Sequence, residues 1–117
     1  ILREPQVVEG LVEKGCLMQV TAGSLVGSFG PEIQAFSEWL LEEGLVHFLA
    51  TDAHGTTSRR PLMSRAYHRA AELLGPQQAK ELCCLNPAAV ARDGEVCEGR
   101  RSTPEVNGGW FRRRRAC

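Results

Sequence analysis

With 117 residues, of which 43% are hydrophobic, the chain has room for one modest domain with a buried core. Its fourteen basic residues balance fourteen acidic ones, which argues against a nucleic-acid binder, although residues 92–117 carry a net charge of +3 and residues 1–91 a net charge of −3. No apolar run approaches the roughly 18 residues that cross a bilayer, and residues 1–5 do not resemble a signal peptide. The five cysteines show no metal-binding spacing and favour a reducing, cytoplasmic setting.

The first 91 residues alternate helical and extended patterns. Pro5 and Pro31 stand where helices begin. Gly15 and Gly44 stand where helices end, and Asn86, before a proline, is a natural N-cap. In chain order, the sequence predicts a helix over 5–14, a strand over 16–20, a glycine-punctuated loop over 21–30, a helix over 31–43, a strand over 45–50, a helix over 62–74 and short helices over 76–84 and 86–91.

This alternation predicts an α/β fold with a parallel sheet. Two strands do not make such a sheet stable, because a parallel sheet is covered on both faces. The chain also opens inside a helix with no strand before it. We therefore expect residues 1–93 to be the C-terminal part of a larger β/α barrel, which needs about 250 residues when complete.

Residues 94–117 lack an apolar period and are rich in Gly, Arg and Glu, so the sequence predicts a basic, disordered tail. The tail ends in a cluster of cations that can contact anionic lipid or an acidic partner peptide. The cluster consists of Arg112, Arg113, Arg114 and Arg115.

Candidate metal ligands follow the predicted strand over 45–50. Asp52 and His54 lie where that strand ends, and catalytic groups of β/α barrels sit at the carboxyl ends of strands. Two residues apart, a carboxylate and an imidazole can share a metal cluster. The alternative is that Asp52 caps a turn, because short D-x-H patterns are common in turns. His47, inside the apolar strand, is better explained as a core histidine.

Arg59 and Arg60 come shortly afterwards, before the helix over 62–74. A guanidinium beside a metal pair suits phosphate-ester chemistry, since Arg holds phosphoryl oxygens bidentately, and the alternative is a solvated helix entrance. The hydroxyls and amides of residues 21–30 can likewise line a phosphate pocket, or its glycines can serve tight turns. No cysteine has an Arg six residues later, which excludes the cysteine-phosphatase mechanism for this segment.

Four segments in this order closely resemble a known family. They are residues 19–30 (QVTAGSLVGSFG), residues 44–54 (GLVHFLATDAH), Arg59-Arg60-Pro61 and Asn86-Pro87. The resemblance is to the bacterial tyrosine-protein phosphatases of the PHP (polymerase and histidinol phosphatase) superfamily, the CpsB/CapC/YwqE type of capsule and exopolysaccharide synthesis. It covers residues 1–93 and leaves the tail out.

The resemblance implies a distorted, TIM-like PHP barrel with a divalent metal cluster, usually manganese, with iron, zinc or magnesium as alternatives. It implies hydrolysis of phosphotyrosine, commonly on the C-terminal tail of a bacterial tyrosine autokinase. Asp52 and His54 take the places of metal ligands, and Arg59 takes the place of a phosphate-binding arginine, with Arg60 as the second choice. Thr51 and Gly55 depart from the family's Ser and Asn at those positions.

The family's His-x-His motif, its middle Glu and His ligands and its His-Pro-Glu-Arg segment are absent from the 117 residues. Since two ligands do not hold a multinuclear site, the chain alone is expected to be inactive and unstable. Two other functions stay open. One is a PHP phosphoesterase acting on a small phosphate such as histidinol phosphate, and the other is a non-catalytic remnant that binds a kinase or export partner.

Overall fold

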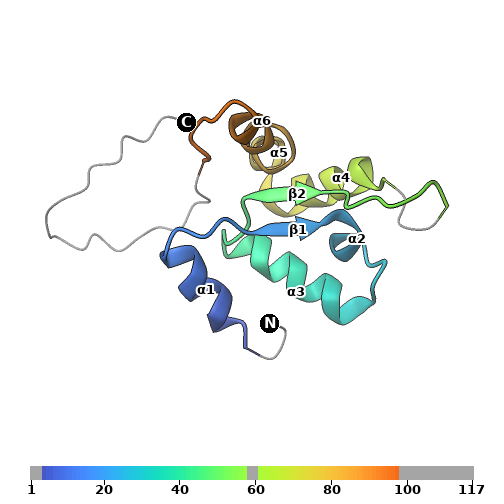
Figure 1. Ribbon diagram of the computed structural model, residues 1–117. Helices are drawn as coiled ribbons and strands as arrows, with labels where there is room; N and C mark the ends of the chain where they lie inside the picture. The colour runs from blue at the N-terminus through green and yellow to red at the C-terminus, as the bar shows by residue number, and fades with distance from the viewer. Residues whose placement is uncertain (1–3, 58–60, 98–117) are drawn as a thin grey trace, which may run out of the picture.

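The computed structural model describes residues 4–57 and 61–97 and shows the helix–strand alternation that the sequence predicts (Figure 1). Its elements are α1 (Gln6–Glu13), β1 (Gln19–Thr21), α2 (Ala22–Leu25), α3 (Pro31–Glu42), β2 (Phe48–Ala50), α4 (Met63–Leu74), α5 (Pro76–Lys80), the π-helical turn η1 (Glu81–Leu85) and α6 (Asn86–Ala91). In these two ranges, no helix has both the length and the apolar character that spanning a bilayer requires.

The two strands of the described residues pair in parallel, as predicted. The register places Gln19 opposite Phe48 and Thr21 opposite Ala50. In Figure 1 both arrows point the same way, with α3 below the strands and α5 and α6 above them. Because parallel strands end at one edge of a sheet, the segments that follow Thr21 and Ala50 leave the sheet on the same side.

The strands are shorter than the sequence predicts, and each begins later. The ladder covers three residues of each strand, whereas apolar runs over 16–20 and 45–50 predicted longer ones. The main-chain carbonyl of Met18 accepts hydrogen bonds from both His47 N–H (2.9 Å) and Phe48 N–H (3.2 Å). This shared acceptor comes just before the regular pairing, so Leu45, Val46 and His47 are buried without belonging to the ladder.

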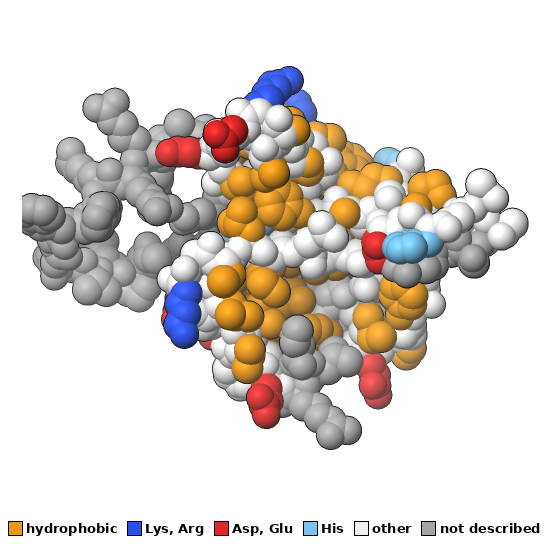
Figure 2. Space-filling model, viewed as in Figure 1, with side chains coloured by type: hydrophobic (Ala, Val, Ile, Leu, Met, Phe, Trp, Pro, Cys, Tyr) orange, Lys and Arg blue, Asp and Glu red, His pale blue; other side chains and the backbone are white. Residues whose placement is uncertain are grey.

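The core lies between the strands and the helices that flank them. Val20 and Leu49 come from the strands, and Leu41 comes from α3. Ala66 and Ala70 of α4 are fully buried, and their small side chains let α4 contact both α2 and α3. Other apolar side chains reach the surface, and Figure 2 shows them gathered above and below the strands.

The helical run over 76–91 differs from the two short helices that the sequence predicts. Its three elements α5, η1 and α6 follow one another without a break. Asn86 has helical angles (φ −64°, ψ −46°), so the prediction that it is an N-cap is wrong. The physical reason is that its side chain turns inward and bonds to other segments, which leaves nothing to cap a helix end.

Asn86 is 2% exposed and joins two segments that are distant in sequence. Its Nδ2 donates to the main-chain carbonyl of His47 (2.8 Å) and to that of Cys97 (3.3 Å), while its Oδ1 accepts from Cys97 N–H (3.0 Å). An amide side chain carries both donors and an acceptor, so one residue satisfies all three main-chain groups.

His47 continues this connection into the sheet. It is 2% exposed, and its Nδ1 accepts a hydrogen bond from Met18 N–H at 3.1 Å. The expectation of a core histidine is thereby confirmed. We call the set Asn86, His47, Met18 and Cys97 the Asn86 junction; it links α6, the start of β2, the start of β1 and the end of the described chain.

An ion pair joins α3 to α4. Arg69 Nε donates to Glu38 Oε1 at 2.9 Å, and Arg69 Nη1 lies 3.0 Å from Glu72 Oε2. Gln34 Nε2 also donates to Glu38 Oε1, at 2.9 Å. The hydrogen bond from Arg69 holds the pKa of Glu38 below its ordinary value of 4.5, against the opposing effect of burial.

The Asn86 junction makes a prediction about stability. Asn86→Ala leaves the His47 carbonyl and the Cys97 N–H without their partner, and we expect it to lower the free energy of unfolding by about 2–3 kcal/mol in urea titrations of the 117-residue chain. Gln77→Ala, which removes an exposed amide from the same helical run, is the matched control and should change stability by less than about 0.5 kcal/mol. Equal losses of unfolding free energy in Asn86→Ala and Gln77→Ala would contradict a stabilising role for the Asn86 junction.

The ion pair makes a prediction about pH. Since folding lowers the pKa of Glu38, its stabilisation is complete above the unfolded pKa and is lost as pH falls through the folded value. Glu38→Gln should therefore cost about 0.5–1 kcal/mol at pH 7 and almost nothing under acidic conditions below both pKa values. Thermal unfolding across this pH range measures the difference, with Glu43→Gln, at an exposed acid outside this ion pair, as the control. If Glu38→Gln lowered stability equally at every pH, the ionised Glu38 would not be the source of the stabilisation.

Candidate metal centre

The backbone turns sharply where β2 ends. Asp52, two residues beyond Ala50, has a φ of +48°, which is uncommon for a residue with a side chain but better tolerated by Asp than by most others. Thr51 Oγ1 accepts a hydrogen bond from Ala53 N–H at 3.4 Å and helps to hold the turn. The turn brings the main-chain carbonyl of Asp52 to His54, whose Nδ1 lies 2.8 Å away.

The side chains of Asp52 and His54 also lie together. Asp52 Oδ1 is 3.7 Å from His54 Nδ1, and the two side chains are 39% and 58% exposed. Both are thus accessible from solvent at the carboxyl end of the strand pair, where the sequence analysis expects a site. The structure brings the two residues together, and their role as metal ligands stays a prediction.

The contact with the Asp52 carbonyl determines which nitrogen of His54 is available. A carbonyl oxygen only accepts hydrogen bonds, so Nδ1 carries the proton in this contact and Nε2 presents its lone pair. Metal-binding histidines commonly use this arrangement, in which a backbone carbonyl orients the ring and fixes the tautomer. The donor chemistry of Asp52 and His54 therefore fits a divalent metal such as manganese or zinc.

These two donors are not a complete site. Among residues 4–57 and 61–97, no group of three or more His, Cys, Asp or Glu side chains is placed to hold a metal ion. Further donors have to complete any metal centre that Asp52 and His54 form.

Arg59 and Arg60, the predicted phosphate-binding residues, lie outside the described residues, as do Arg112, Arg113, Arg114 and Arg115. The structure therefore does not test these predictions.

The segment over 21–30 is only partly the loop that the sequence predicts, because Ala22–Leu25 form the buried turn of α2. A Cβ on Gly23 would stand 3.0 Å from the Phe29 ring, and one on Gly27, which has a φ of +80°, would stand 2.7 Å from Gln34 Oε1. Close packing and turn geometry thus account for these two glycines. A phosphate-binding role for the segment stays a prediction.

Sequence reasoning missed the inward role of Asn86 and the positive φ of Asp52. The run Thr51-Asp52 after an apolar strand did contain a turn signal, since both residues bond readily to nearby backbone. Nothing local in the sequence distinguishes Asn86 from a helix cap, because its partners His47 and Cys97 are distant.

Comparisons with known proteins agree with this architecture. The family described as capsular polysaccharide synthesis, CpsB/CapC, matches residues 1–92. Over 59 residues the chain is 48% identical to the tyrosine-protein phosphatase YwqE of Bacillus subtilis, an alignment that covers 50% of this chain and 23% of YwqE. Over 91 residues it is 34% identical to the tyrosine-protein phosphatase CpsB of Streptococcus pneumoniae, covering 74% of this chain and 37% of CpsB.

A solved structure is similar in three dimensions. It comes from work on YwqE of Bacillus subtilis and CpsB of Streptococcus pneumoniae, described as metal-dependent tyrosine phosphatases, and it matches with a TM-score of 0.77 at 35% identity. The match covers 82% of this chain and 39% of that one. The helix–strand architecture is therefore similar to that of part of a solved bacterial phosphatase.

The chain belongs to the CpsB/CapC family of capsular polysaccharide synthesis, which confirms the resemblance found in its sequence. It spans less than two fifths of the length of the relatives that it matches.

The geometry of Asp52 and His54 predicts weak binding of a divalent metal at this turn. In NMR spectra of the 117-residue chain, added Mn²⁺ should broaden the His54 ring and Asp52 signals first. Asp52→Asn, which keeps a side chain that tolerates positive φ, and His54→Ala should each raise the required Mn²⁺ concentration at least about tenfold. His68, an exposed histidine on α4, is the internal control. Broadening of His68 at the same Mn²⁺ concentration as His54 would rule out a specific site.

Proposed function

We propose that this chain is the C-terminal part of a metal-dependent protein-tyrosine phosphatase. In this proposal residues 1–93 complete the distorted β/α barrel of the PHP superfamily, and residues 94–117 form a basic tail. Family membership supports the proposal, as do the tyrosine-protein phosphatases YwqE and CpsB among the relatives. The observation that carries it is the 3.7 Å approach of Asp52 and His54 at the carboxyl end of β2.

The proposal gives separate roles to the turn after β2 and to the arginines that follow it. Asp52 and His54 hold a metal cluster, with manganese as the first expectation, and the Asp52 carbonyl fixes the orientation of the His54 ring. A divalent metal held by these two side chains would supply Lewis-acid chemistry for the attack of water on phosphorus and for neutralising charge on the phosphoryl oxygens. Arg59, or Arg60 in its place, holds the phosphoryl group bidentately.

The proposed substrate is phosphotyrosine in a protein, specifically the C-terminal tail of a bacterial tyrosine autokinase that controls capsule synthesis. The relatives' names support the phosphotyrosine part of this proposal. They disfavour the alternative of a small-phosphate phosphoesterase. The proposed setting is cytoplasmic, and Arg112, Arg113, Arg114 and Arg115 can add a weak contact with anionic membrane lipid.

A chimera tests the activity without any assumption about the rest of the protein. Residues 1–92 replace the matching segment of YwqE from Bacillus subtilis, and the hydrolysis of a phosphotyrosine peptide is measured with Mn²⁺. The chimera should be active, while the 117-residue chain alone should show no metal-dependent turnover because it lacks the other ligands. Asp52→Ala in the chimera should lower kcat/KM by at least about 100-fold, the loss typical of a group that stabilises transition-state charge.

His68→Ala in the same chimera is the control and should leave the rate unchanged. Circular dichroism checks that the Asp52→Ala chimera remains folded. An undiminished rate in Asp52→Ala removes Asp52 from the site, and metal-dependent turnover by the isolated chain overturns the expectation that it is incomplete. Faster hydrolysis of histidinol phosphate than of the peptide would favour the small-phosphate alternative.

A further inference from the structure

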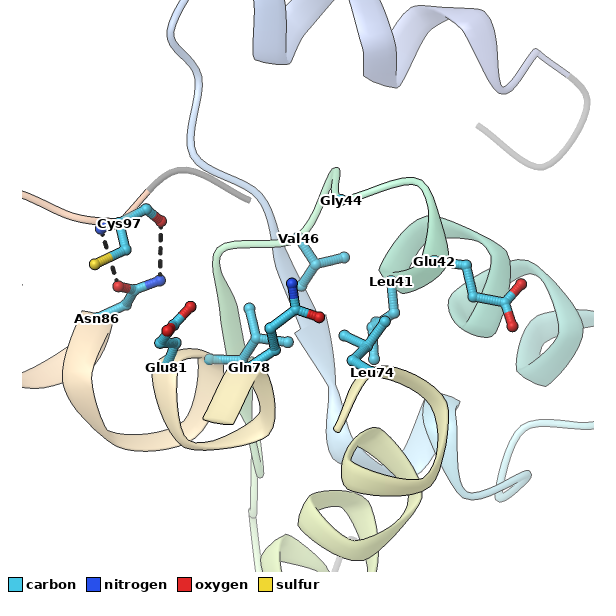
Figure 3. Close-up of a pocket in the computed structure, with 10 residues that line it drawn as sticks. Leu41, Glu42, Gly44, Val46, Leu74, Gln78, Glu81, Asn86 and Cys97 are labelled. Atoms are coloured by element: carbon cyan, nitrogen blue, oxygen red, sulfur yellow. Dashed lines mark hydrogen bonds between the residues drawn. The ribbon is translucent and has the colours of Figure 1, made fainter. Parts of the chain in front are cut away.

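A second hollow lies at the opposite end of β2 from the candidate metal centre. It is a cavity of about 60 Å³ formed where α3 ends, where the chain enters β2 and where α5 and η1 pass over it (Figure 3). Val46, which precedes β2, contributes to its wall, whereas Asp52 follows β2. The cavity is therefore separate from the proposed phosphatase site, and its occupant does not depend on that function.

The lining of this cavity combines an apolar floor with acidic ends. Leu41, Val46 and Leu74 contribute apolar side chains. Figure 3 shows the carboxylates of Glu81 and Glu42 on opposite sides of the view, with the Gln78 amide between them. Such a surface suits a ligand with an apolar body and cationic groups, because the apolar part is desolvated while the cations stay near the carboxylates and water.

The described chain ends at this cavity. Cys97 forms part of its wall. The Asn86 side-chain amide holds it there, donating to the main-chain carbonyl of Cys97 (3.3 Å) and accepting from its N–H (3.0 Å). The sequence continues for another 20 residues, with six arginines against two glutamates, and contains Trp110-Phe111 directly before Arg112–Arg115. Residues 1–91, by contrast, carry a net charge of −3.

We propose that this cavity binds the chain's own segment 110–115. Trp110 or Phe111 packs on the apolar floor, and the arginines that follow lie near Glu42 and Glu81. Twelve residues separate Cys97 from Trp110, and such a connection reaches up to about 40 Å, far more than a return to the cavity at which it starts. A tether of this kind gives an effective concentration of about a millimolar, so a weak contact is enough to fill the cavity.

Hydrogen exchange of the full 117-residue chain tests the proposal. Trp110→Ala, and separately the replacement of Arg112–Arg115 by Gln, should speed amide exchange in residues 41–46 and 78–86 by about threefold or more. Arg100→Gln with Arg101→Gln is the matched control, because it removes tail charge outside the proposed segment and should change nothing at the cavity. Circular dichroism of each variant checks that the described part of the chain remains folded.

A charge exchange separates docking from a general change in stability. Glu42→Arg with Glu81→Arg should give the same faster exchange, and adding Arg112–Arg115→Glu to that variant should restore the protection. Unchanged exchange in the tail variants overturns the proposal, as does failure of the charge exchange to restore protection. Binding of the chain to phosphatidylglycerol vesicles through Arg112–Arg115, with exchange at the cavity unaffected by the tail variants, overturns it in favour of a lipid contact.

Discussion

One buried side-chain amide, that of Asn86, joins the helical run over 76–91 to the segment that enters β2 and to the end of the described chain. Asn86 satisfies main-chain groups of His47 and Cys97, and His47 in turn accepts the N–H of Met18. Each of these groups lies where burial without a partner costs free energy. Asn86 therefore anchors His47, the residue directly before β2, from 39 positions further along the chain. The strand that follows His47 leads to the turn that carries Asp52 and His54.

The stabilising contacts and the candidate metal ligands lie at opposite ends of the strand pair. The Asn86 junction and the cavity beside it lie before the strands begin, and Asp52 and His54 follow where β2 ends. Barrel proteins commonly divide their two faces in this way, with loops at the carboxyl ends of strands free to vary in chemistry. The exposed side chains of Asp52 and His54 fit this division, since groups that meet a substrate have to remain accessible. The ion pair between Glu38 and Arg69 adds a contact on the helical layer without touching either end.

The sequence was most informative where local chemistry decides the structure. Pro5 and Pro31 marked the starts of α1 and α3 to within a residue, and Gly44 marked the end of α3 to within two. The strand bounds were less predictable, because pairing is set by the Met18 carbonyl rather than by apolar character. Spacing indicated that Asp52 and His54 lie close together, but the positive φ that brings the Asp52 carbonyl to His54 has no unique sequence signal. The roles of both residues still rest on family resemblance and donor chemistry.

The π-helical turn η1 has a consequence for how this family can vary. A π-helix holds one more residue between its hydrogen-bonded partners than an α-helix, and such turns are often the trace of a single inserted residue. Each residue turns a helix by about 100°, so η1 determines the direction in which the Asn86 side chain leaves the helix axis. A relative that had lost one residue within Glu81–Leu85 would carry its asparagine on a different face of the helix. Losing one residue in this stretch would therefore turn the amide away from His47 and Cys97, although the chain would be only one residue shorter.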